Sequence, residues 1–195
     1  EGGLMAAPGT LFVMARVPGG IREALMRPLL ERGLDVTLGR RISPLRNWHQ
    51  TLSDLHPPEA REAMRLACAR IDAPSFDMQL DRLQSAGAPP RRVLWLYLPA
   101  HGKPDGLTRL QASVREKLRA NGIVETQGHR AHVTVSYNAP QEIAPLDITP
   151  VSWRVDAIEL VEVAGQGDDY RYEVVEAWPL RAPATPPPQQ LGLLG

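Results

Sequence analysis

The chain has 195 residues, of which 43% are apolar, so it can bury the core of one compact domain or of two tightly joined lobes. Its 22 basic and 22 acidic residues cancel to a formal net charge of zero, which leaves no overall basic footprint for nucleic acid. A single cysteine excludes a disulfide within the chain and suits the reducing cytoplasm, where we expect the protein to reside. No apolar run approaches the roughly 18 residues of a membrane span, and we expect no membrane contact.

In the first half of the chain, apolar runs typical of strands alternate with segments whose apolar residues recur at the spacing of a helix. An apolar run ends at Pro18-Gly19-Gly20, and Leu25 and Leu29 then recur at the four-residue interval of a helix. The expected elements are, in order, a strand at 10–17, a helix at 21–33, an irregular basic segment at 34–47, a strand at about 47–55, a helix at 58–71 and a strand at 75–84.

The second half repeats this order after a turn at Gly87-Ala88-Pro89-Pro90. The helix in this half is expected to end at Asn121-Gly122. The expected elements are a strand at 91–98, a loop at 99–106, a helix at 107–120, a strand at about 129–137, a loop at 140–150 and two long strands at 151–163 and 170–180.

A His-x-Thr pattern occupies matching places in the two halves. His49 lies 38 residues after Leu11 in the first strand, and His132 lies 39 residues after Val93 in the strand that opens the second half. This spacing indicates an internal duplication and predicts an α+β fold. In that fold two antiparallel sheets, related by a pseudo-twofold axis and backed by helices, face a central groove. We expect this two-lobed domain at 10–181, after a tag remnant or disordered start at 1–9 and before a disordered, Pro-rich tail at 182–195.

The paired motifs predict an acid–base site. In a strand, residues i and i+2 share a face, so His49 lies beside Thr51 and His132 beside Thr134. Two imidazoles across a groove can protonate a leaving oxygen and deprotonate a nucleophile, while the threonine hydroxyls donate hydrogen bonds to a phosphate. The alternative interpretation is that both are ordinary hydrogen-bonded strand histidines.

The chain resembles the RNA 2′,3′-cyclic phosphodiesterases, also called 2′-5′ RNA ligases, of the two-histidine phosphoesterase superfamily. The resemblance covers about residues 10–180. It depends on Leu11-Phe12-Val13, Asn47-Trp48-His49-Gln50-Thr51-Leu52, Arg130-Ala131-His132-Val133-Thr134-Val135, Arg171-Tyr172-Glu173-Val174 and Trp178-Pro179-Leu180.

The resemblance implies a substrate and a division of roles. The substrate would be an RNA or a nucleotide with a 2′,3′-cyclic phosphate, opened to a 2′-phosphate without a metal, and the site would also support reversible 2′-5′ RNA ligation. His49 would donate a proton to the 3′ oxygen, His132 would accept one from water, and Thr51 and Thr134 would hold the phosphate. We expect a monomer.

The chain departs from the family pattern at Tyr137, where the second motif usually continues to an arginine. Arg130, two places before His132, is the expected substitute for binding the phosphate. Arg46, Trp48 and Tyr137 are further candidates for the substrate groove. This departure leaves two alternatives open: an enzyme for 2′-5′ oligonucleotides or small cyclic nucleotides, and an RNA-binding module without catalysis.

No metal or cofactor is expected from the histidines. His129 and His132 form a His-x-x-His pattern, and His56 follows the first motif. Zinc sites need three or four suitable ligands, and the sequence shows no second cluster to complete this set.

Overall fold

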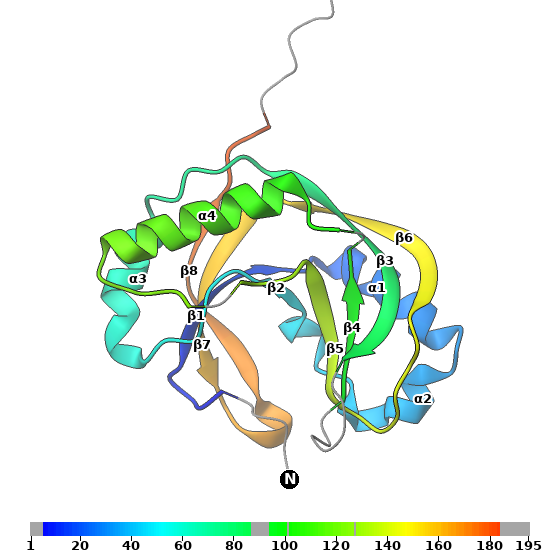
Figure 1. The fold of residues 1–195 in the computed structure, drawn as a ribbon. Helices are drawn as coiled ribbons and strands as arrows, with labels where there is room; N and C mark the ends of the chain where they lie inside the picture. The colour runs from blue at the N-terminus through cyan, green and yellow to red at the C-terminus, as the bar shows by residue number, and fades with distance from the viewer. Residues whose placement is uncertain (1–5, 87–93, 101, 127, 184–195) are drawn as a thin grey trace, which may run out of the picture.

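The computed structural model describes residues 6–86, 94–100, 102–126 and 128–183. Two antiparallel sheets of four strands each form the centre of the molecule, with helices packed against them (Figure 1). The predicted α+β fold with two antiparallel sheets is therefore confirmed. The predictions for the first five residues, for the turn at 87–90 and for most of the C-terminal tail lie outside the described residues.

The first sheet has the strand order β2-β1-β7-β8. Its members are β1 (Leu11–Arg16), β2 (His49–Thr51), β7 (Ala157–Ala164) and β8 (Arg171–Pro179). Among the described residues, strand β2 pairs only with β1, where Arg16 lies opposite His49 and Met14 opposite Thr51. The first His-x-Thr motif therefore occupies an edge of this sheet.

The second sheet has the order β5-β4-β3-β6. Its members are β3 (Phe76–Ala86), β4 (Leu94–Pro99), β5 (His132–Ala139) and β6 (Leu146–Val155). The second His-x-Thr motif begins β5, which is likewise an edge strand. The two motifs thus take equivalent places in two sheets of similar order.

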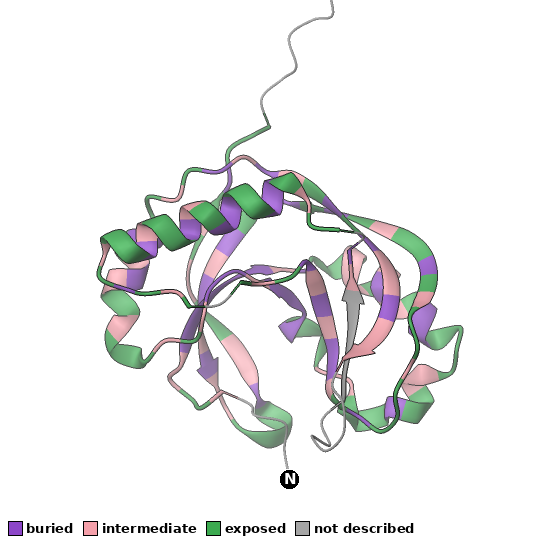
Figure 2. Ribbon diagram, viewed as in Figure 1, coloured by how far each residue is buried: buried purple, intermediate pink, exposed green. Residues whose placement is uncertain are grey.

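The helices link and cover the sheets. They are α1 (Gly19–Leu30), α2 (Leu34–Leu38), α3 (Arg61–Cys68) and α4 (Asp105–Ala120), with short 3-10 helices at Gly39–Arg41, Leu45–Asn47, Pro58–Ala60 and Gly167–Asp169. Helix α1 contacts β6, α3 contacts β7, and α4 contacts both α3 and β3. Figure 2 shows the buried stripe along α4, formed by Leu107, Leu110, Val114 and Leu118 among others. No helix in the described part of the chain is long and apolar enough to cross a membrane.

Strand β1 is buried on both faces. Leu11, Val13 and Ala15 point into the main core, whereas Phe12 and Met14 belong to a second, smaller apolar cluster. This division follows from the two-residue period of a strand. The second cluster also contains Tyr170 and packs against Tyr172, so one face of β1 forms a wall beside the first motif.

The predicted strand at 151–163 is wrong as a single element. Strand β6 ends at Val155 in the second sheet and β7 begins at Ala157 in the first, so the chain passes between the sheets at Asp156. The predicted loop at 140–150 also ends too late, because Leu146–Pro150 belongs to β6. Pro150 is tolerated there because β6 is an edge strand and the missing N–H breaks no inner ladder.

Candidate active site

The two edge strands that carry the motifs meet through Gln50. The side chain of Gln50 is fully buried, and its Oε1 accepts the backbone N–H of His132 at 2.9 Å. Its Nε2 donates to the carbonyls of Arg130 and Thr51, both at 2.8 Å. These partners fix the orientation of the amide, since a backbone N–H only donates and a carbonyl only accepts. The middle residue of the first motif therefore holds the backbone of the second.

Both motif histidines are oriented in the same way. Nδ1 of His49 donates to the carbonyl of Asn47 at 2.6 Å, and Nδ1 of His132 donates to the carbonyl of Arg130 at 3.0 Å. Each ring thus contacts the residue two places earlier in the chain. A carbonyl cannot donate, so Nδ1 carries the proton and Nε2 is the nitrogen left to exchange one. This matched arrangement gives two imidazoles with equivalent titrating atoms.

Burial disfavours the charged form of both rings. His49 is 7% exposed, and desolvation lowers its pKa to about 4, although the bond to the Asn47 carbonyl works in the opposite direction. The charge of His132 is close enough to lower the pKa of His49 further. Desolvation also lowers the pKa of His132, again opposed by its bond to a carbonyl. Without a bound anion, His49 is therefore neutral near pH 7.

Aromatic rings enclose His49 on two sides. The ring of Tyr172 meets it edge-on with centroids 5.2 Å apart, and the ring of Phe12 lies at 5.3 Å. Tyr172 is hydrogen-bonded to Tyr137, and Tyr137 in turn to Thr134. A continuous path of contacts therefore leads from the first histidine to the threonine of the second motif. Desolvation raises the pKa of Tyr137, so its phenol stays protonated at neutral pH.

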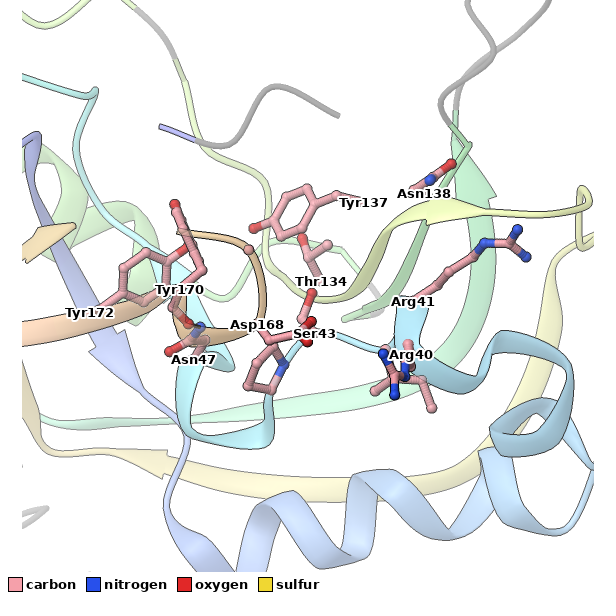
Figure 3. A pocket seen from close by; sticks show the side chains of 13 residues that line it. Arg40, Arg41, Ser43, Asn47, Thr134, Tyr137, Asn138, Asp168, Tyr170 and Tyr172 are labelled. Atoms are coloured by element: carbon pink, nitrogen blue, oxygen red, sulfur yellow. Dashed lines mark hydrogen bonds between the residues drawn. The ribbon is translucent and has the colours of Figure 1, made fainter. Parts of the chain in front are cut away.

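A pocket of about 450 Å³ opens beside the side chains of Tyr137, Tyr170 and Tyr172 (Figure 3). Thr134 and Tyr137 line it from β5, Tyr172 lines it from β8, and basic residues line its far side. Figure 3 shows Tyr137 and Thr134 on one side of the pocket and Arg40 and Arg41 on the other. Its full lining is Arg40, Arg41, Ile42, Ser43, Pro44, Asn47, Thr134, Tyr137, Asn138, Gly167, Asp168, Tyr170 and Tyr172.

The predicted basic residues Arg130 and Arg46 do not line this pocket. Arg130 is exposed and lines a different pocket of about 450 Å³, together with Arg82 and Lys103. Its charge still lowers the pKa of His132, so it lies near the second motif. Arg46 is exposed, and its carbonyl accepts a hydrogen bond from Arg16. Thr51 is half-buried in β2, directly after Gln50.

The prediction that Trp48 contributes to the substrate groove is wrong. The side chain is 1% exposed and belongs to the main core. Its Nε1 donates to the carbonyl of Ser43 at 3.0 Å, which satisfies the one polar atom of the buried ring. In an extended chain, neighbours point to opposite faces, so a ring beside His49 is directed away from it.

Sequence reasoning missed three residues of the site. Gln50 occupies the middle position of the first motif, and its neighbours in the sequence, His49 and Thr51, gave no signal for its role. Asn47 is 6% exposed, donates to the carbonyl of Tyr170 at 3.0 Å and holds His49 through its own carbonyl. Tyr172 was part of the family resemblance but had no assigned role, because nothing in the sequence places β8 next to the first motif.

Two antiparallel sheets whose edge strands bring paired His-x-Thr motifs together define the two-histidine phosphoesterase class. A sequence profile of the 2′-5′ RNA ligase superfamily matches residues 48–167, a range that contains both motifs. The chain belongs to the 2′-5′ RNA ligase superfamily. No curated protein sequence matches the chain.

Solved structures support the same fold. Escherichia coli LigT in its apo form superposes with a TM-score of 0.68 at 23% identity, covering 90% of this chain and 99% of LigT. A structure described as a phosphoesterase gives 0.68 at 24% identity over 90% of this chain and 99% of its own. The protein TT0787 of Thermus thermophilus gives 0.66 at 21% identity over 89% of this chain and 98% of its own. LigT has also been crystallised with 3′-AMP.

Proposed function

We propose that this site hydrolyses the 2′,3′-cyclic phosphate of an RNA end or a nucleotide to a 2′-phosphate. The observation that carries the proposal is the pairing of His49 and His132. Both rings have Nδ1 fixed on a carbonyl, and the charge of His132 lies close enough to lower the pKa of His49. Such a pair supplies one acid and one base. The binding of 3′-AMP by LigT supports a nucleotide substrate.

In the proposed reaction a water oxygen attacks the phosphorus and the bond from phosphorus to the 3′ oxygen breaks. Nε2 of His132 accepts the proton of the water, and Nε2 of protonated His49 gives its proton to the 3′ oxygen. The phosphate anion is needed for this role, because a nearby negative charge raises the pKa of a histidine that burial has lowered. A 5′-hydroxyl in place of the water gives a 2′-5′ linkage, and the reverse step cleaves that linkage.

The hydroxyl groups of the site are proposed to bind the non-bridging phosphate oxygens. Thr51 and Thr134 follow the two histidines at equivalent positions, and Tyr137 adds a phenol that is hydrogen-bonded to Thr134. A phenol offers a neutral donor where the family usually has an arginine. Arg130, on the edge beside His132, is proposed to supply positive charge for the remainder of the nucleotide.

The test is hydrolysis of the four 2′,3′-cyclic mononucleotides and of a short RNA with a cyclic phosphate end, in buffer with EDTA. Chromatography against 2′- and 3′-phosphate standards identifies the product. We expect a 2′-phosphate, and a loss of about 10²–10⁴-fold in kcat for His49→Ala and for His132→Ala. Thr51→Ala and Thr134→Ala should lower kcat/KM, whereas Thr108→Ala, an exposed threonine of α4, is the matched control.

Tyr137 favours a second candidate, an RNA-binding module without catalysis, because the arginine expected at this position is replaced by a neutral group. RNA binding that weakens with salt, without turnover of any cyclic phosphate, would establish this candidate in place of the enzyme. Cleavage of 2′-5′ dinucleotides without hydrolysis of 2′,3′-cyclic phosphates would instead identify a related phosphoesterase of different substrate.

A further inference from the structure

Four ionisable side chains gather beside the site, outside the path between its histidines. Asp54 and His56 follow the first motif, and Glu125 and His129 precede the second. One ligand atom from each of Asp54, Glu125 and His129 can be chosen so that all lie within 4.8 Å of one another. Oδ1 of Asp54 lies 3.5 Å from Nε2 of His129. The cluster therefore joins the segments that lead out of one motif and into the other.

Hydrogen bonds orient both carboxylates of the cluster. Oε2 of Glu125 accepts the backbone N–H of Asp54 at 2.7 Å, and Oε1 lies 2.6 Å from Nε2 of His56. Oδ2 of Asp54 accepts the backbone N–H of Thr126 at 2.7 Å and its hydroxyl at 2.8 Å. These bonds direct Oδ1 of Asp54 toward His129. Carboxylates held by neighbouring groups are typical of metal ligands, which depend on such support for their orientation.

The imidazole of His129 adds evidence for a metal site that the two carboxylates alone would not provide. Its Nε2 is buried, and within the part of the chain that the structure describes this atom makes no hydrogen bond. Desolvation lowers the pKa of His129, and the charges of Arg115 and Lys103 lower it further, against the opposing effect of Asp54 and Glu125. A buried imidazole nitrogen aimed at a carboxylate, without a hydrogen bond, is suited to accept a metal ion.

We propose that Asp54, Glu125 and His129 bind a divalent transition-metal ion such as Zn²⁺. One imidazole and two carboxylates form a donor set that such ions accept, with a fourth position left for water. Spacing along the sequence did not reveal this set, because Asp54 and Glu125 are 71 residues apart. The ion would join the end of the first motif to the segment before Arg130, whose carbonyl holds His132. Its proposed role is structural, and it is independent of the proposed hydrolysis.

The test uses the whole chain, stripped with EDTA and dialysed, and titrated with ZnCl₂ by calorimetry and by thermal melting. We expect one ion per chain and a rise in Tm of about 5 °C or more when free Zn²⁺ exceeds its Kd 100-fold. His129→Gln and Asp54→Asn should weaken binding at least about 10-fold. Glu116→Gln, which alters an exposed glutamate of α4, should leave the affinity unchanged.

The double variant His49→Asn/His132→Asn separates this site from the paired histidines. Retained affinity in the double variant, with loss in His129→Gln, supports the proposal, whereas the reverse pattern overturns it, as does the absence of binding to wild type. Melting in EDTA shows whether each variant folds. If His129→Gln does not fold, X-ray absorption of zinc-loaded wild type decides: one imidazole among oxygen ligands supports the site, and two imidazoles overturn it.

Discussion

Gln50, inside the first motif, accepts a hydrogen bond from the backbone N–H of His132, the first residue of the second motif. The same amide donates to the carbonyl of Arg130, which also accepts Nδ1–H of His132. One buried side chain thus fixes both the strand that carries His132 and the carbonyl that orients its ring. The position of one histidine relative to the other depends on a residue with no proposed chemical role.

Replacing Gln50 by Leu should separate this positioning role from stability. The change removes both hydrogen bonds across the sheet edges and should lower the free energy of unfolding by about 1–3 kcal/mol. We also expect kcat for cyclic phosphate hydrolysis to fall at least about 10-fold with less change in KM, because the acid and base lose their mutual geometry. Gln79→Leu, at an exposed position of β3, is the matched control. Unchanged kcat in a folded Gln50→Leu would contradict this role.

Acidification should destabilise the fold through His49. Its pKa is about 4 in the folded protein against 6.5 in the unfolded chain, so the unfolded state binds more protons between these values. Stability should therefore fall as pH decreases from 6.5 to 4, by about 3 kcal/mol from this group. Urea unfolding across this range should show a shallower pH dependence in His49→Gln than in wild type. Equal slopes would mean that His49 is not buried in the neutral form.

Removing the hydroxyl of Tyr137 tests whether this neutral group donates a hydrogen bond to the phosphate at the position where the family usually has an arginine. Tyr137→Phe deletes the hydrogen bonds to Thr134 and Tyr172 but keeps the ring. A loss of about 1 kcal/mol in binding the transition state corresponds to roughly a 5-fold fall in kcat/KM. Steady-state kinetics measure this change, with a melting curve to confirm folding. An unaltered kcat/KM would exclude Tyr137 from phosphate binding.

A methyl group at Gly106 should destabilise the contact between α4 and β3. A Cβ at this helix position would overlap the side chain of Phe76, which lies on β3. Alanine improves helix propensity, but the overlap with a packed ring is expected to dominate and to cost about 1–3 kcal/mol. The free energy of unfolding of Gly106→Ala measures the balance. Adding Phe76→Leu should recover part of the loss, and a stabilised single variant would show that the ring moves freely.

The thiol of Cys68 should be inert in the folded protein. It is 1% exposed, and burial raises its pKa to about 12, so almost no thiolate forms at neutral pH. We expect a thiol reagent such as iodoacetamide to modify it only at the rate of unfolding. Mass spectrometry with increasing urea checks this, and rapid modification in native buffer would contradict it.

The strand pattern and the repeated motif were sufficient to predict two antiparallel sheets, whereas catalysis by His49 paired with His132 stays a prediction. They could not predict the passage at Asp156, because a buried apolar run continues unbroken while the chain changes sheets. Trp48 was a candidate for the groove only through its place beside His49, and adjacent strand positions face opposite ways, which leaves it in the core. The contacts of Gln50 with His132, of Asp54 with Thr126 and of Tyr172 with His49 each join residues at least about 70 positions apart along the chain, where local pattern carries no information.

The passage at Asp156 also sets the order in which the molecule can fold. Strands β1 and β2 are made first and pair with each other, but the second neighbour of β1 is β7. About 140 further residues must therefore be synthesised before that edge of β1 is paired. The second sheet, formed from residues 76–155, can assemble earlier around β3. During synthesis on the ribosome, the first histidine therefore acquires its surroundings last, and a chain stopped before residue 157 would contain both motifs but lack β7 and β8, and with them the Tyr172 ring beside His49.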